Sequence, residues 1–143
     1  MKKPTAVETA LDIAYEAHKG ARTFSGKPYI LHPIRVMEQM DTDEERVIAL
    51  LHDVLEDTET TEEELREHFS TRIVGQIKVL THLPDEPYED YIGRVALYAT
   101  STKIKLADLR DNTRIERIPR MTDGALKRLQ RYHGAIRRLE RQE

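Results

Sequence analysis

The segment from Val47 to Asp57 is apolar around most of a helix circumference, yet it carries four ionisable side chains, among them His52, Asp53 and Glu56. Burying an unpaired carboxylate costs free energy, so these groups need a partner. A divalent cation is one such partner, and His and Asp are good ligands for it. If the segment is one continuous helix, His52 and Glu56 lie one turn apart on the same side, and Asp53 and Asp57 have the same spacing. The alternative is a core helix whose acidic end reaches solvent.

The composition describes a small domain whose metal ligands can only be nitrogen and oxygen. The chain has 143 residues, which suits one domain over residues 1–143, and it contains no cysteine. Any metal must therefore be held by His, Asp or Glu. No apolar run approaches the ~20 residues of a membrane span, and the first residues lack the apolar core of a signal peptide. We expect a cytoplasmic protein without membrane contact.

The net charge of −3 conceals a strong asymmetry along the chain. Residues 1–102 hold 11 basic and 20 acidic residues, whereas residues 103–143 hold 12 basic and 6 acidic ones. A basic C-terminal third indicates an anionic ligand or a nucleic-acid contact, or else a solvated, arginine-rich helix surface. The negative total charge and the absence of an aromatic-rich basic patch argue against nucleic acid.

Hydrophobic residues recur at helical spacing throughout, and no segment alternates with period two. Ser or Thr at the helix starts, often with Glu three residues later, predicts the N-termini. Pro33 suits a first helical position, which would place His32 at the cap with its side chain free of the helix body. We predict an all-α fold of about seven or eight helices over Thr5–Lys19, Pro33–Met40, Thr42–Asp57, Thr61–Phe69, Ser70–Thr81, Tyr88–Thr100, Ile104–Ile118 and Thr122–Arg141.

A second acid in apolar surroundings lies late in the chain. Asp108 is on a largely apolar face of the segment 104–109, and Asn112 lies one turn further along. The carboxylate of Asp108 could be paired with Arg110 or Arg114, as buried carboxylates usually are.

Two imidazoles and two carboxylates together favour a metal site. His32, His52, Asp53 and Asp108 would supply mixed nitrogen and oxygen ligation, with water in the remaining positions. Such a ligand set suits Mn²⁺, Fe²⁺ or Zn²⁺. A cation with open positions serves as a Lewis acid and as a source of hydroxide.

The order His, then His-Asp, then Asp is similar to that of the HD-domain metal-dependent phosphohydrolases. The chain more closely resembles the hydrolase domain of RelA/SpoT-type alarmone enzymes, over about residues 10–118. This resemblance implies a compact HD-domain helical bundle, and, since the chain has no room for a synthetase domain, a stand-alone small alarmone hydrolase. The segments that carry it are Ala17–Gly20, Ser25–Pro33, Ala49–Thr58 and Lys105–Asp108.

The resemblance implies a function and a role for particular residues. It implies Mn²⁺-dependent removal of the 3′-pyrophosphate from guanosine 3′,5′-bis(diphosphate), ppGpp, or its pentaphosphate relative, giving GDP or GTP. His32, His52, Asp53 and Asp108 would bind the metal, for which other divalent cations are possible. Glu56 and Asp57 would orient or deprotonate the attacking water, and Asn112 and Ser25 would contact the substrate.

The chain departs from the family pattern in two places that affect the substrate. Thr23-Phe24 stands where the family carries adjacent basic residues before Ser-Gly. The family reads Asp-Arg-Leu-x-Asn after its last ligand, whereas this chain has Asp108-Leu109-Arg110-Asp111-Asn112. Asp111 would repel a substrate phosphate if it faced the pocket. An HD-fold phosphohydrolase acting on another nucleotide or on NADPH, and a nucleotide-sensing HD domain, therefore stand as alternatives.

The phosphates of an alarmone need cations beyond the metal. Lys or Arg can hold a phosphate through charge-assisted hydrogen bonds. We expect Arg22, Lys105 and Arg114 to supply them, and Tyr132 on the last helix to stack on the guanine. The sequence does not indicate an oligomeric state.

Overall fold

The computed structural model describes residues 2–141, and within this range it is all-helical apart from a single antiparallel bridge between Arg22 and Pro28. The predicted all-α fold is confirmed. The described helices are α1 (Ala6–His18), α2 (Leu31–Glu38), α3 (Asp43–Leu51), α4 (Val54–Asp57), α5 (Glu62–Arg66), α6 (Thr71–Val79), α7 (Tyr88–Val95), α8 (Ala99–Asn112), the 3₁₀ helix η1 (Ile115–Arg117) and α9 (Asp123–Glu140).

The helix starts are where the side-chain caps predict them. Thr5, Thr42 and Thr61 each form a capping box with the glutamate three residues later. Ser70 and Thr122 cap α6 and α9 by accepting a hydrogen bond from a backbone N–H in the first turn. Each cap satisfies N–H groups that have no partner inside the helix, so these boundaries are determined locally.

The predicted continuous helix Thr42–Asp57 is wrong. The helix breaks at His52 and Asp53, between α3 and α4, because Asp53 has φ −123° and ψ 8° and leaves the helical conformation. The carboxylate of Asp53 instead binds His18 and Tyr29, which come from the end of α1 and the following loop. The argument from four-residue spacing within one helix therefore does not hold.

His32 is also placed differently from the prediction. Helix α2 begins at Leu31 with Ile30 as its N-cap, so His32 is inside the first turn rather than at the cap. Its side chain is buried, with 1% exposure. Pro33 is tolerated at the third position because the first N–H groups of a helix need no intrahelical acceptor.

The predicted helix Tyr88–Thr100 begins at Tyr88 but ends early, and the predicted helix Ile104–Ile118 is displaced toward the N-terminus. Helix α7 ends at Val95, and α8 runs from Ala99 to Asn112, followed by the short η1. Thr102 is buried in the first turn of α8, where its hydroxyl donates a hydrogen bond to the carbonyl of Val95.

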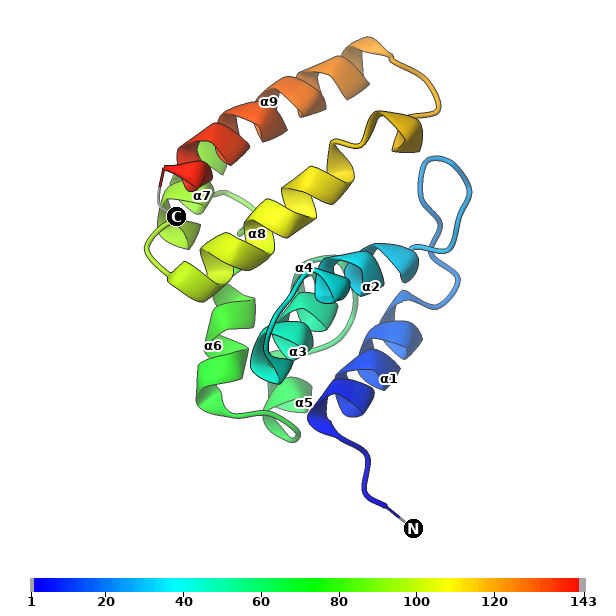
Figure 1. The fold of residues 1–143 in the computed structure, drawn as a ribbon, viewed down its shortest axis with the longest axis vertical. Coiled ribbons are helices and arrows are strands. Elements are labelled where there is room, and N and C mark those ends of the chain that lie inside the picture. The colour runs from blue at the N-terminus through cyan, green and yellow to red at the C-terminus, as the bar shows by residue number, and fades with distance from the viewer. Residues whose placement is uncertain (1, 142–143) are drawn as a thin grey trace.

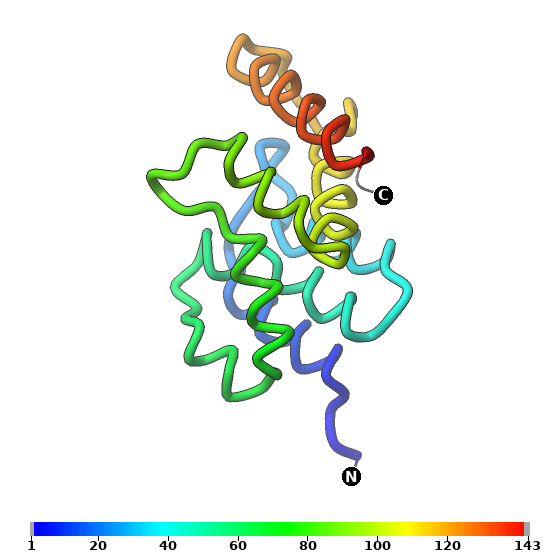
Figure 2. The backbone as a smooth tube through the Cα atoms, turned by 90° about the vertical axis from the view of Figure 1, so that its left-hand side faces the viewer, coloured from blue at the N-terminus to red at the C-terminus, as the bar shows by residue number. Residues whose placement is uncertain are grey.

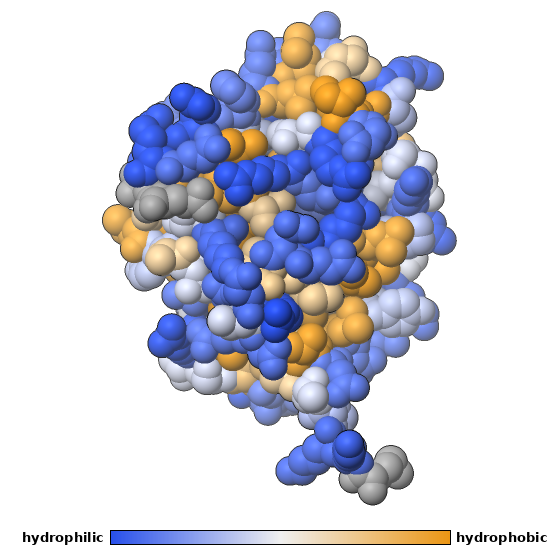
Figure 3. Space-filling view, viewed as in Figure 1, coloured by the Kyte–Doolittle hydropathy of each residue, from blue (hydrophilic) through white to orange (hydrophobic). Residues whose placement is uncertain are grey.

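Helix α3 is central and packs against α1, α2, α6 and α8 (Figures 1 and 2). Its residues Ile48, Leu50 and Leu51 are fully buried in the core. Helix α9 packs on α7 and α8, and the α1–α2 loop lies beside the segment that joins α8 to α9 (Figure 1). Hydrophilic residues cover most of the face in Figure 3, between smaller hydrophobic patches. None of the described helices is long and apolar enough to cross a membrane.

Replacing Leu50 with alanine should lower the free energy of unfolding by about 2–5 kcal/mol, since it leaves a cavity in the centre of the bundle. Leu83→Ala is the matched control, because Leu83 is 55% exposed and should change stability by no more than about 0.5 kcal/mol. Urea unfolding followed by circular dichroism measures both. Equal loss in the two variants would contradict the placement of Leu50.

Candidate metal centre and adjoining pocket

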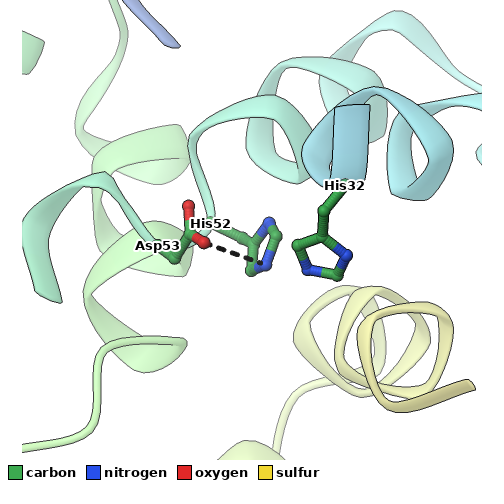
Figure 4. Close-up of side chains that lie close together, drawn as sticks. All are labelled: His32, His52 and Asp53. Carbon is green, nitrogen blue, oxygen red and sulfur yellow. Dashed lines mark ion pairs between the residues drawn. The ribbon is translucent and has the colours of Figure 1, made fainter. Parts of the chain in front are cut away.

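Four side chains from separate parts of the chain meet where α2, α8 and the α3–α4 break come together. His32 comes from α2, Asp108 from α8, and His52 and Asp53 from the break itself. All four are buried, with exposures between 1% and 7%. The two imidazole rings lie edge to face with centroids 5.4 Å apart, and Asp53 lies beside His52 (Figure 4).

The donor atoms of these side chains have the spacing of ligands around one cation. The Nε2 atoms of His32 and His52 lie 2.8 and 3.3 Å from the same Oδ1 of Asp108. Ligands bound at ~2.1 Å and at right angles lie roughly 3.0 Å from each other. One donor atom each of His32, His52 and Asp53 also lies within 4.8 Å of the other two. The cluster therefore fits a divalent cation held by nitrogen and oxygen.

Further hydrogen bonds fix the orientation of these groups. His52 Nδ1 donates to the carbonyl of Ala49 at 2.7 Å, which leaves Nε2 free to face a cation. Asp53 accepts hydrogen bonds from His18 Nε2 at 3.1 Å and from the Tyr29 hydroxyl. Such outer contacts orient metal ligands before the metal arrives.

Charge in the cluster is balanced between carboxylates and imidazoles. Burial by itself would lower the pKa of His52, but the charges of Asp53 and Asp108 outweigh it and raise the pKa to about 9. Burial would raise the pKa of Asp108, yet Lys105 and His52 hold it well below its usual range. Burial would also raise the pKa of Asp53, but His52, His18 and Tyr29 hold it below its usual range. Both acids thus remain ionised and available to a cation.

A pocket of about 560 Å³ opens beside the cluster. His52, Asp53 and Asp108 form part of its wall, and so do Glu56 and Asp57 on α4. One oxygen of Glu56 accepts a hydrogen bond from the backbone N–H of His82 at 2.8 Å. Burial and the neighbouring charges of Glu56 and Asp53 raise the pKa of Asp57 to about 6. The break after α3 thus brings both acids to the same pocket as the ligands, although they do not share one helix with them.

The predicted substrate residues divide into two groups. Lys105, Asn112 and Tyr132 line the pocket, whereas Arg22, Ser25 and Arg114 are not among its lining residues. In the α1–α2 loop, the backbone of Arg22 pairs with Pro28, and the Ser25 hydroxyl hydrogen-bonds Thr23.

Arg114 lies outside the pocket and pairs with acidic side chains there. Its guanidinium lies 2.7 Å from Glu116 and 3.7 Å from Asp111. The placement of Arg114, Arg22 and Ser25 therefore does not support the predicted substrate contacts.

Several pocket residues were not identified from the sequence. Phe24, Arg117, Arg120 and Arg128 line the pocket. The arginines belong to the basic C-terminal third. The charge of this region indicated an anionic ligand but did not identify the individual residues that would bind it. The Arg128 guanidinium lies over the Phe24 ring, 5.0 Å from its centroid, and joins α9 to the α1–α2 loop. Tyr29 also lines the pocket, and it lies in the segment Ser25–Pro33 that carries the family resemblance, so the sequence did point to this position.

Asp111 does not face this pocket. It is buried and is not among the residues that line the pocket; its carboxylate contacts His32, Arg35 and Arg117. The condition for repulsion between Asp111 and a substrate phosphate is therefore not met, because the carboxylate is bound by these side chains and does not line the pocket.

The profile of the HD domain family matches residues 10–121, so the chain belongs to this family. A protein of Aquifex aeolicus named guanosine-3′,5′-bis(diphosphate) 3′-pyrophosphohydrolase is 33% identical over 120 residues, which cover 76% of this chain and 17% of that one. A protein of Brucella melitensis named GTP pyrophosphokinase rsh is 31% identical over 121 residues, covering 79% of this chain and 16% of that one. The chain thus spans less than a fifth of the length of these relatives.

A solved structure has a similar fold over almost the whole chain. It is described as a metazoan ortholog of SpoT that hydrolyzes ppGpp, and it covers 99% of this chain and 98% of its own with a TM-score of 0.72. The sequence identity is 22%, so the similarity establishes the HD-domain helical fold. Together with the buried His and Asp cluster, membership of this family indicates a divalent metal site.

His52→Ala should remove most of the bound metal, because it deletes a buried ligand of the cluster. Elemental analysis of purified protein, after loading with Mn²⁺ and gel filtration, measures the metal per chain. His68→Ala is the control, since His68 is exposed and lies outside the cluster. Equal metal content in His52→Ala and the wild type would contradict the assignment.

Proposed function

We propose that this chain is a metal-dependent pyrophosphohydrolase that removes the 3′-pyrophosphate of ppGpp or pppGpp and yields GDP or GTP. The observation that carries the proposal is the pocket itself, which is lined by His52, Asp53 and Asp108 of the cluster, by two further carboxylates and by arginines. The name of the Aquifex aeolicus relative supports this substrate. His32, His52, Asp53 and Asp108 would hold Mn²⁺, which supplies Lewis-acid activation of the phosphate and of water when bound.

Glu56 and Asp57 are proposed to act on the attacking water. The N–H of His82 holds one carboxylate oxygen of Glu56, so the second oxygen can accept a hydrogen bond from water. Asp57, with a pKa of about 6, is ionised at neutral pH and can take up the proton that the water loses. Neither carboxylate belongs to the ligand cluster, which leaves both free for proton transfer.

The cations of the pocket are not equally available to a phosphate. Lys105 is held by Asp108 at 2.8 Å, and Arg117 is held by Asp111 and Asn112 at 2.9 and 3.1 Å. Within residues 2–141, Arg120 and Arg128 line the pocket without an acidic partner. We assign the distal diphosphate to these two arginines and the purine to the Tyr132 ring, while Lys105 and Asn112 face the metal-bound end.

A second candidate is the hydrolysis of another phosphorylated nucleotide, or of NADPH, at the same centre. The observation that favours it is the α1–α2 loop, in which Phe24 is 82% exposed at a position where the family resemblance implies a basic residue. Arg128 lies over this ring from α9. The cation beside this loop therefore comes from α9, and the pocket could select a different arrangement of phosphates.

The test measures pyrophosphate and orthophosphate release from ppGpp, pppGpp, GTP, ATP and NADPH, with Mn²⁺ and with a chelator. We expect metal-dependent pyrophosphate release from the two alarmones. Glu56→Gln should lower kcat by ~10²–10⁴-fold while the metal content stays unchanged, because it removes a carboxylate that acts on the attacking water and not a ligand.

Glu63→Gln is the matched control, since Glu63 is exposed on α5 and should leave turnover unchanged. Orthophosphate release from NADPH without alarmone turnover would establish the second candidate instead. Normal turnover in Glu56→Gln would remove Glu56 from the mechanism.

Arg128→Gln and Arg120→Gln should each raise KM for the alarmone by about 10-fold or more, since each loses a charge-assisted hydrogen bond to phosphate. The change in kcat should be smaller if the contact is equally strong in the ground and transition states. Arg114→Gln is the control, because Arg114 lies outside the pocket. An increase in KM for Arg114→Gln alone would favour the assignment made from the sequence.

A further inference from the structure

The ring of His32 is held between two carboxylates that lie on one side of α8. Its Nε2 is 2.8 Å from Asp108 Oδ1, and its Nδ1 is 2.6 Å from Asp111 Oδ2. Asp108 and Asp111 are three residues apart, so both project toward α2. The second contact is the shorter one and lies entirely inside the protein, with Asp111 at 8% exposure.

The Asp111 contact determines which nitrogen of His32 can bind a cation. A metal ligand must be a neutral imidazole, which has one N–H and one lone pair. When Nδ1 donates its hydrogen to Asp111, the lone pair is on Nε2, which faces Asp108 and the rest of the ligand cluster. Without an acceptor at Nδ1, the ring could also rotate or adopt the other tautomer.

Asp111 is itself fixed from two sides. Arg35 donates to it from Nε at 2.9 Å and from Nη2 at 3.1 Å, and Arg117 donates from Nη1 at 2.9 Å. These charge-assisted bonds offset the cost of burying the carboxylate and leave it little freedom to turn away. Arg117 also donates to Asn112 and lines the pocket. Its contacts therefore link the pocket to Asp111 and, through Asp111, to Nδ1 of His32.

We propose that Asp111 is a positioning residue that orients His32 for metal binding. It occupies the variable position of the related Asp-Arg-Leu-x-Asn pattern, so the resemblance assigns it no role. The inference rests on the metal centre of the proposed function and does not depend on the identity of the substrate.

The test is the dissociation constant of Mn²⁺ for the full chain without nucleotide, measured from the electron paramagnetic resonance signal of free Mn²⁺. Asp111→Ala should weaken binding by about 10–100-fold, the usual effect of losing such an outer contact. Asp111→Asn should weaken it less, because the amide oxygen can still accept from Nδ1. Arg35→Gln, which leaves the Asp111–His32 contact in place, should have the smallest effect of the three.

Asp85→Ala is the matched control, since Asp85 is exposed and distant in sequence from the ligands. Melting of the metal-free proteins by circular dichroism separates loss of stability from loss of affinity, and if Asp111→Ala fails to fold, Asp111→Asn decides. A folded Asp111 variant that binds Mn²⁺ as tightly as the wild type would overturn the positioning role while the metal centre stands. Absence of Mn²⁺ binding in the wild type would overturn the metal centre and this role together.

Discussion

The burial of two ionised carboxylates in a helical core is the constraint on which the rest of the structure depends. Asp53 and Asp108 are 7% and 5% exposed, and an unpaired charge at such positions would be strongly unfavourable. Each carboxylate is surrounded by hydrogen-bond donors. Asp53 is bound by His18 and Tyr29, and Asp108 by His32, Lys105 and Asn112.

This need for partners explains the irregular features of the fold. The helix that starts at Thr42 is interrupted at His52 and Asp53, where Asp53 turns to meet groups from α1 and its loop. His32 enters the first turn of α2 and points at α8 rather than capping the helix. Both features bring side chains from distant segments to one point, and such local departures from regular structure are typical of functional sites.

The four basic residues of the C-terminal third that line the pocket divide into two groups with different partners. Arg117 is bound to Asp111 and Lys105 to Asp108, so both cations offset the negative charge of carboxylates on α8. Arg120 and Arg128 face the pocket, and Arg128 contacts Phe24 on the opposite loop. The cations around the pocket therefore differ in their availability, since two are held within the protein and two can meet the anionic ligand that we propose.

The sequence by itself determined the all-helical class, most helix starts and the four candidate ligands. These follow from local signals, namely Ser and Thr caps, apolar periodicity and the His, His-Asp and Asp motifs. Only the tertiary structure decided the break at His52 and Asp53, the buried position of His32 and the contact between Asp111 and His32. The reason is physical: the His32–Asp111 contact joins residues 79 positions apart, and such a contact depends on how helices pack rather than on the residues beside each one. The same holds for the pocket, where helix packing placed Arg128 on the lining and left Arg114 outside it.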